Sequence, residues 1–246
     1  MGKNLVQQAR GKGGPRYKAP SFRYAGESKI PPVRKETLSG AILDIIHCSG
    51  HSAPLLKIKY DNGESTLLVA PEGMRVGDRV MFGTEAPIEN GNITELSKIP
   101  EGTLIFHIES TPGDGGKFAR SGGSFARILS RTKDKVIIEL PSKKQKALHP
   151  TCRAVIGTIA GGGRLEQPIL KAGRMFFKMR AKNKLWPKTS GGAQNAVDHP
   201  FGNKRTSRKS KARPVPHNAP PGRKTGMLRP RRTGRKRGSS IIIKKV

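Results

Sequence analysis

Asp198 and His199 stand side by side in the stretch NAVDHPFG at residues 195–202. Enzymes use a carboxylate next to an imidazole for general base catalysis, provided that one side chain orients the other and a nucleophile lies within hydrogen-bond reach. Adjacent residues of an extended chain point to opposite sides, and no GxSxG elbow or activated cysteine accompanies this pair. We therefore do not predict an enzyme, and an acyl transferase that uses His199 is kept as the alternative.

A contact with nucleic acid explains the same stretch better. Three glycines flank the pair, and glycine lets a backbone approach RNA closely. The imidazole of His199 can stack on a base or form a hydrogen bond with a phosphate or a 2′-hydroxyl group. A plain turn without RNA contact is the other interpretation that stays open. The residues of this stretch that we expect to contact RNA are Asn195, Asp198 and His199.

No metal, cofactor or nucleotide site is expected. His47, Cys48 and His51 lack a second ligand pair at zinc-finger spacing, and Cys48 and Cys152 form no CxxC pair, so both cysteines are expected to be buried thiols. The loop GDGGKFARSGGS resembles a phosphate-cradling loop, but Phe118 stands where such a loop needs Ser or Thr for magnesium. Its glycines and cations suit contact with RNA phosphates, or a flexible linker. The cations concerned are Lys117 and Arg120.

The charge of the chain requires a polyanionic partner. Among 246 residues there are 48 Lys and Arg but only 17 Asp and Glu, which leaves a formal net charge of +31. The net charge is +8 in residues 1–35, −6 in 36–110, +13 in 111–185 and +16 in 186–246. No run of 18 apolar residues and no apolar stretch at the N-terminus are present. We therefore expect neither a membrane span nor secretion, and the cytoplasm is the default location.

Alternation of apolar and polar residues predicts a mainly β fold for the middle of the chain. Residues 36–110 carry short strands with an Asn-Gly hairpin signal, which indicates a small barrel, and His107 there is expected to be structural. Residues 111–185 carry four further strand patterns, which indicate a second barrel of the SH3-like size class. The stretch QPILKAGRMFFKMRAKNKLW favours a short basic helix, and no independent fold is expected from Pro187 onward.

The two ends of the chain are expected to be basic extensions, 1–35 and 186–246, that bind RNA. In the first extension, cations alternate with aromatic residues, so phosphate neutralisation and base stacking can alternate along one strand. The second has almost no aromatic residues and is expected to recognise shape and phosphate density; nuclear localisation is the alternative for such clusters. The expected RNA-binding residues are Arg10, Lys12, Arg16, Tyr17, Lys18, Arg23 and Tyr24 in the first extension, and Lys204, Arg205, Arg208, Lys209, Arg231 and Arg232 in the second. Arg127 and Arg153 are expected to bind RNA from the basic face of the second barrel.

Four motifs of the chain resemble those of the ribosomal protein L2 (uL2) family of archaeal and eukaryotic type. They are VAPEGMRVGD at 69–78, GGKFARSGGSF at 115–125, CRAVIGTI at 152–159 and NAVDHPFG at 195–202. The resemblance implies an OB-fold barrel followed by an SH3-like barrel of the translation-protein type. It also implies a chain embedded in large-subunit rRNA near the peptidyl transferase centre, where it supports subunit association, tRNA binding and peptide-bond formation. Other ribosomal proteins, and small-subunit rRNA at an intersubunit bridge, are the further partners that the family implies.

The chain departs from the bacterial pattern of that family at several positions. Ala196 stands where bacterial members have Pro, and Phe201 stands where they have a second His. His199 therefore carries over, whereas a role for a second histidine does not. His51 stands where a bacterial Arg contacts RNA, and it is included among the expected RNA-binding residues on that basis. A DNA-compacting chromatin protein is the second alternative function, since high positive charge alone also suits duplex DNA.

Overall fold

The structure, a computed structural model, describes residues 2–33, 36–203 and 213–230. Six of the cations expected to bind RNA lie outside the described residues. They are Lys204, Arg205, Arg208, Lys209, Arg231 and Arg232.

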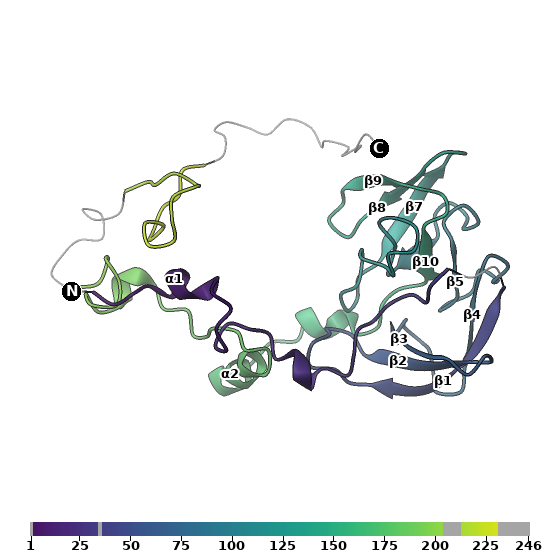
Figure 1. Ribbon diagram of the computed structural model, residues 1–246, viewed down its shortest axis with the longest axis horizontal. Coiled ribbons are helices and arrows are strands. Elements are labelled where there is room, and N and C mark those ends of the chain that lie inside the picture. The colour runs from purple at the N-terminus through teal and green to yellow at the C-terminus, as the bar shows by residue number, and fades with distance from the viewer. Residues whose placement is uncertain (1, 34–35, 204–212, 231–246) are drawn as a thin grey trace. The chain divides into compact units, whose positions relative to one another are not determined.

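The described chain divides into two units (Figure 1). Residues 22–33 and 36–168 form the unit that we call the β-domain. Residues 2–21, 169–203 and 213–230 form the unit that we call the extension unit, which brings together segments from both ends of the sequence.

In the β-domain, ten described strands form one hydrogen-bonded sheet. The order of neighbouring strands is β3-β2-β1-β4-β5-β10-β6-β7-β8-β9, and all neighbours are antiparallel except β4 and β5. The mainly β fold is therefore confirmed. The strands are β1 (Leu38–Ile46), β2 (Leu55–Tyr60), β3 (Ser65–Val69), β4 (Arg79–Phe82), β5 (Ile93–Glu95), β6 (Leu104–Phe106), β7 (Ala126–Arg131), β8 (Val136–Glu139), β9 (Gln145–Leu148) and β10 (Arg153–Ile156).

The first four strands pack around one apolar cluster. Leu55 and Ile58 of β2 and Leu68 of β3 have at most 1% of their surface exposed, whereas the lysines of β2 point to solvent. Strands β2 and β3 pair in antiparallel register through a turn in which Gly63 has a φ of 84°. Glycine adopts this left-handed conformation at little cost, which explains why the Asn-Gly signal marks the turn. The predicted hairpin is confirmed.

A second apolar cluster lies under β7, β8 and β9. It contains Ile128 and Ile138, and also Leu96 and Ile105, which precede the expected domain boundary at residues 110 and 111. The expected domain boundaries stay a prediction, because the sheet continues through both halves.

The sequence pattern did not predict β5. This strand has only three residues, too few for a visible alternation, and it forms because β4 and β10 pair with it on either side.

His107 lies inside the β-domain with none of its surface exposed. Burial disfavours the charged imidazolium, and the nearby Arg120 charge disfavours it further, so the pKa of His107 falls to about 3. Its backbone has a φ of 49°, and the ring lies so close to Gly116 that a side chain at that position would overlap it. His107 is therefore a neutral, tightly packed imidazole in the interior of the β-domain.

The lowered pKa of His107 predicts a loss of stability in acid. An unfolded imidazole has a pKa near 6.5, so below that pH the unfolded state takes up a proton that the folded state does not. The free energy of unfolding therefore has its full value above about pH 6.5 and decreases as the pH falls towards the folded pKa of about 3. In that window we expect His107→Asn to reduce the slope of unfolding free energy against pH by up to about 1.4 kcal/mol per pH unit. Asn tolerates a positive φ, so the exchange adds little backbone strain. Urea unfolding of both proteins at about pH 7, 5.5 and 4 measures the slope, and equal slopes would contradict the prediction.

The extension unit contains two helices, α1 (Val6–Arg10) and α2 (Ala172–Ala181). The second helix confirms the short basic helix expected in this stretch. A 3-10 turn lies in the extension unit at Gly191–Ala193, another lies in the β-domain at Gly162–Leu165, and a third, Ser21–Arg23, lies where the two units meet in the sequence. Among the described residues, no helix is both long enough and apolar enough to cross a membrane.

Candidate nucleic-acid interface

The imidazole of His199 holds the 195–202 stretch together. Its Nδ1 atom accepts a hydrogen bond of 3.0 Å from the backbone N–H of Phe201, and the two rings meet edge to face. The ring lies against Gly191, where any side chain would overlap it. Burial lowers the pKa of His199, although a hydrogen bond to the backbone of Thr225 raises it. A neutral ring therefore connects three separate parts of the extension unit.

Asp198 has a different partner from its neighbour. Its Oδ1 atom lies 3.5 Å from Nζ of Lys3, and the backbone N–H of Lys3 donates a hydrogen bond of 2.8 Å to the carbonyl of Val197. The ion pair is exposed to solvent, so it adds little stability by itself. Asp198 and His199 thus serve separate contacts between segments of the chain. This arrangement supplies positions for a backbone to approach RNA, and it does not aim a carboxylate at the imidazole.

The N-terminal cations form an exposed row on the extension unit. Arg10 ends helix α1 without any buried neighbour in that helix, and Lys12, Arg16 and Lys18 are also exposed. Tyr17 is half-buried. Their charges are therefore exposed to solvent, although the chain here forms helix α1 and turns and not an extended strand; contact with phosphates stays a prediction.

Arg23, Tyr24 and His51 lie in the β-domain. The guanidinium of Arg23 lies 5.2 Å from the ring centroid of Phe22, which is itself largely exposed. The ring of Tyr24 packs on Gly50. The Nδ1 atom of His51 lies 3.1 Å from Sγ of buried Cys48. Arg23 is thus presented on a stacking surface, whereas the imidazole of His51 is engaged at its Nδ1 atom by the thiol.

Hydrogen bonds to the carboxylate of Asp114 hold the glycine-rich loop in a defined conformation. Burial would raise the pKa of Asp114, but backbone N–H groups of Gly116, Ser110 and Thr111 and the charge of Lys117 together lower it. The Asp114 carboxylate lies 3.6 Å from Nζ of Lys117. This acid fixes the turn and partly neutralises the lysine that was expected to bind phosphate.

Arg120 and Arg127 differ in how much of their charge is available. Arg120 is half-buried and donates a hydrogen bond of 2.7 Å to the carbonyl of Ser28. Arg127 is exposed on β7, where it lines a groove of about 580 Å³ together with Lys143 and Arg164. The Nε atom of Arg164 is buried and has no hydrogen-bond partner among the described residues. This groove therefore brings three cations and one acid, Glu139, together beside the glycine-rich loop, and Glu139 lies opposite Arg127 across β7 and β8.

Arg153 was expected to bind RNA, but the structure places it in the interior of the β-domain. Its surface is only 5% exposed, and its guanidinium forms a two-contact ion pair with fully buried Glu109. A further donor binds the carbonyl of Pro31 at 2.7 Å, and the guanidinium lies over the ring of Phe82. A guanidinium that is buried and paired with a carboxylate in the interior does not reach a phosphate. The strand pattern around it did not reveal this, because the acid that pairs with it lies 44 residues away.

Both expected buried thiols are confirmed. Cys48 and Cys152 are free and buried. Burial, strengthened by the charge of Glu109, raises the pKa of Cys152 to about 11. Its thiol therefore stays protonated near neutral pH, which suits a packed side chain and not a nucleophile.

The sequence interpretation missed an aromatic and cationic cluster around the end of α2. Phe176 and Trp186 lie there with Arg180 and Lys184, beside Arg16 and Tyr17 from the first extension. The signal that could have indicated it is the stretch MFFKMRAKNKLW, in which three aromatic residues flank four cations. No pattern in either stretch indicates that the two pack together.

Comparisons with known proteins agree on one family. Residues 32–82 match the model described as Ribosomal Proteins L2, RNA binding N-terminal domain, and residues 89–219 match Ribosomal Proteins L2, C-terminal domain. The large ribosomal subunit protein uL2 of Archaeoglobus fulgidus is 47% identical over 237 residues, which cover 96% of this chain and 100% of that protein. The uL2 proteins of Methanococcus aeolicus and Nanoarchaeum equitans are 46% and 48% identical, and each alignment covers 96% of this chain and at least 99% of the relative.

Proposed function

The chain belongs to the ribosomal protein L2 (uL2) family, and from this premise we propose that it binds large-subunit rRNA near the peptidyl transferase centre. It is a structural protein of the large ribosomal subunit. In that position it supports subunit association, tRNA binding and peptide-bond formation. Its partners are rRNA, other ribosomal proteins and, at an intersubunit bridge, small-subunit rRNA. The cytoplasm is the compartment in which this assembly works.

The observation that carries this proposal is the charge of the extension unit. Its described residues contain sixteen Lys and Arg and a single acid, Asp198, which already forms an ion pair with Lys3. Each cation that meets a phosphate releases condensed counterions from the RNA, and this release drives binding. A unit of this charge is poorly suited to stand alone, because its cations repel one another. RNA supplies the compensating charge.

A competition experiment separates this function from its two alternatives. Full-length chain bound to labelled large-subunit rRNA is challenged with unlabelled rRNA or with duplex DNA at the same salt and phosphate concentrations. We expect rRNA to compete far better than DNA, because shape and unpaired bases add to the phosphate contacts. Equal competition would favour a chromatin protein. Acyl transfer by the purified chain without RNA would favour an enzyme, and we expect none.

The contacts of His199 lead to a prediction about translation. We expect His199→Ala to leave assembly of large subunits near normal while slowing subunit joining or peptide-bond formation by about fivefold, the equivalent of losing one hydrogen bond of about 1 kcal/mol. The physical reason is that the ring positions the 195–202 stretch through Gly191 and Phe201. Variant and wild-type subunits are compared in subunit-joining and single-turnover peptide-bond assays.

The matched control for that experiment is His217→Ala, which removes an exposed imidazole from the same unit. We expect its particles to behave as wild type. Full activity of the His199→Ala particles would remove this residue from the functional set.

A further inference from the structure

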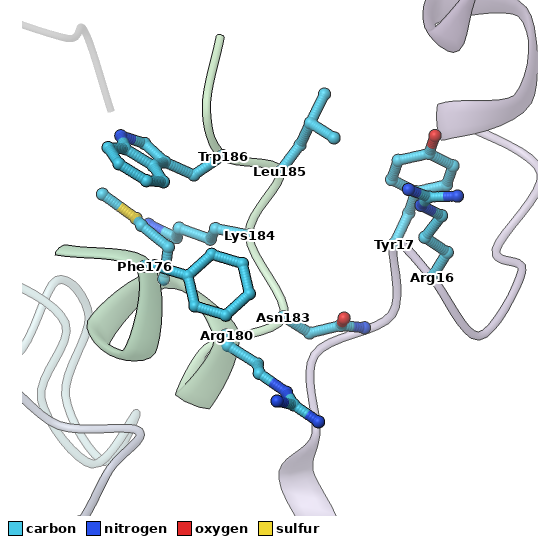
Figure 2. A pocket seen from close by; sticks show the side chains of 9 residues that line it. Arg16, Tyr17, Phe176, Arg180, Asn183, Lys184, Leu185 and Trp186 are labelled. Carbon is cyan, nitrogen blue, oxygen red and sulfur yellow. The ribbon is translucent and has the colours of Figure 1, made fainter. Parts of the chain in front are cut away.

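We propose that a pocket between the first extension and the end of helix α2 binds one unpaired nucleobase of the rRNA (Figure 2). This inference rests on the proposed function and adds a defined ligand site to it. The pocket has a volume of about 140 Å³, roughly ten times the ~10–15 Å³ of cavity that holds one water molecule. It is therefore of a size for a single planar group. The residues that line it are Arg16, Tyr17, Phe176, Met179, Arg180, Asn183, Lys184, Leu185 and Trp186.

The end of α2 has a geometry that builds one wall of this pocket. Asn183 follows the last helical turn with a φ of 49°, and its backbone N–H donates to the carbonyl of Arg180 at 3.0 Å. The N–H of Lys184 donates to the carbonyl of Met179 at 2.8 Å. These two bonds are those of a Schellman motif, in which the residue after the helix takes the left-handed conformation. The motif turns the chain back, so that the residues after α2 line the same pocket as the last turn of the helix.

The side chain of Asn183 holds the opposite wall in place. Its Nδ2 atom donates hydrogen bonds to the carbonyls of Pro15 at 2.6 Å and Lys18 at 2.8 Å. These two carbonyls bracket Arg16 and Tyr17. Figure 2 shows Arg16 and Tyr17 on one side, Phe176 and Leu185 on the other, and Asn183 reaching from the second side to the first. One side chain thus joins segments that lie about 165 residues apart in the sequence.

The walls present aromatic surface that is only partly covered. Phe176 is 41% exposed, and Tyr17 and Trp186 are half-buried. None of these three rings is buried, so they are not part of an apolar core. Rings held at an open pocket offer faces on which a base can stack, a contact that proteins use for unpaired nucleotides.

The charges at the pocket select an anionic ligand. Arg16, Arg180 and Lys184 line it, and no acid is among its lining residues. A nucleotide combines a flat ring with a phosphate, and these are the two groups that aromatic faces and cations bind. An apolar peptide would leave the cations without a partner. The combination therefore favours an RNA nucleotide over a segment of another protein.

The single tryptophan of the chain makes the pocket directly observable. Trp186 is the only Trp among the 246 residues, so its fluorescence reports on the pocket alone. Full-length chain is titrated with a single-stranded RNA hexanucleotide and with an abasic ribose-phosphate strand of the same length. We expect the RNA to quench Trp186 at concentrations at which the abasic strand does not, because the backbone charge is equal and only the bases differ.

Two neighbouring phenylalanines supply the variant and its matched control. Phe176 lines the pocket, whereas Phe177 is 65% exposed and does not line it. We expect Phe176→Ala to weaken hexanucleotide affinity roughly 5- to 100-fold and Phe177→Ala to change it less than about twofold. Should circular dichroism show that Phe176→Ala unfolds the helix, Tyr17→Leu in the opposite wall gives the same test, and the same weakening is expected.

Three outcomes would contradict the proposal that this pocket binds a nucleobase. Equal quenching by the abasic strand would mean that phosphates alone are bound, and equal affinities of the two phenylalanine variants would mean that no base stacks there. Stronger quenching by an acidic, phenylalanine-containing hexapeptide would assign the pocket to a protein partner. Each of these leaves the proposed function intact as long as wild-type chain binds large-subunit rRNA with a steep salt dependence. Loss of that binding would instead overturn the proposed function.

Discussion

Replacing Glu109 with Gln lowers the free energy of unfolding by about 3 to 5 kcal/mol, the cost of leaving a buried guanidinium without its counter-charge. The Glu109 carboxylate accepts hydrogen bonds from the backbone and the guanidinium of Arg153, and from the backbone N–H of Gly115. Arg153 in turn binds the carbonyl of Pro31. One ion pair thereby ties strand β10 to the segment before β1 and to the glycine-rich loop. Its loss affects the stability of the whole β-domain.

Urea unfolding at neutral pH measures this effect, with Glu85→Gln as the control because Glu85 is an exposed acid of the same domain. The double variant Glu109→Gln with Arg153→Met should recover part of the loss, since it removes the uncompensated charge together with its partner. A loss below about 1 kcal/mol for Glu109→Gln would contradict the assignment of Arg153 to the interior.

Neutralising the first extension should flatten the salt dependence of rRNA binding. Each phosphate contact contributes roughly 0.7 to 0.9 to the slope of log affinity against log salt concentration, so three lost contacts reduce the slope by about 2 to 3. The affinity at a fixed low salt concentration falls in parallel. Filter binding over a salt series measures both quantities. The three substitutions, made together, are Arg10→Gln, Arg16→Gln and Arg23→Gln.

The control for this variant removes three exposed cations from the segment that carries a net negative charge. We expect a change of slope below about 1, because that segment offers RNA no concentrated positive field. An unchanged slope for the extension variant would show that these arginines meet no phosphates. The control substitutions are Lys57→Gln, Lys59→Gln and Arg79→Gln.

Strands with clear alternation were predictable from the sequence because burial on one face leaves a two-residue period. Leu55, Ile58 and the Asn-Gly turn of the first hairpin are examples. Strand β5 was not predictable, because a strand of three residues depends on its neighbours for its conformation. The pairing of Arg153 with Glu109 was not predictable either, since it joins positions 44 residues apart without a local pattern.

The sequence predicted which segments of the candidate interface carry positive charge, but it predicted few of the contacts that hold those segments together. Composition and pattern predicted that the cations of the first extension lie exposed for contact with RNA, and the structure shows those of residues 10–18 exposed; their contact with RNA stays a prediction. The contact between the first extension and the end of α2 depends on the side chain of Asn183. The position of Asn183 depends on where α2 ends, and the spacing of apolar residues does not predict that position. The packing of His199 on Gly191 is a similar case. Such contacts are set by tertiary structure and become visible only in the fold.

Sedimentation with ribosomal particles shows whether the chain is held in the large subunit by its phosphate contacts. Cell extract is separated on sucrose gradients in low salt and again at roughly 0.5 M salt, and the chain is located by antibody in each fraction. We expect the chain to sediment with the large subunit in both gradients, because an extension unit with sixteen cations and one acid makes many phosphate contacts at once. Recovery of the chain in the soluble fractions, or with chromatin, in the low-salt gradient would contradict this expectation.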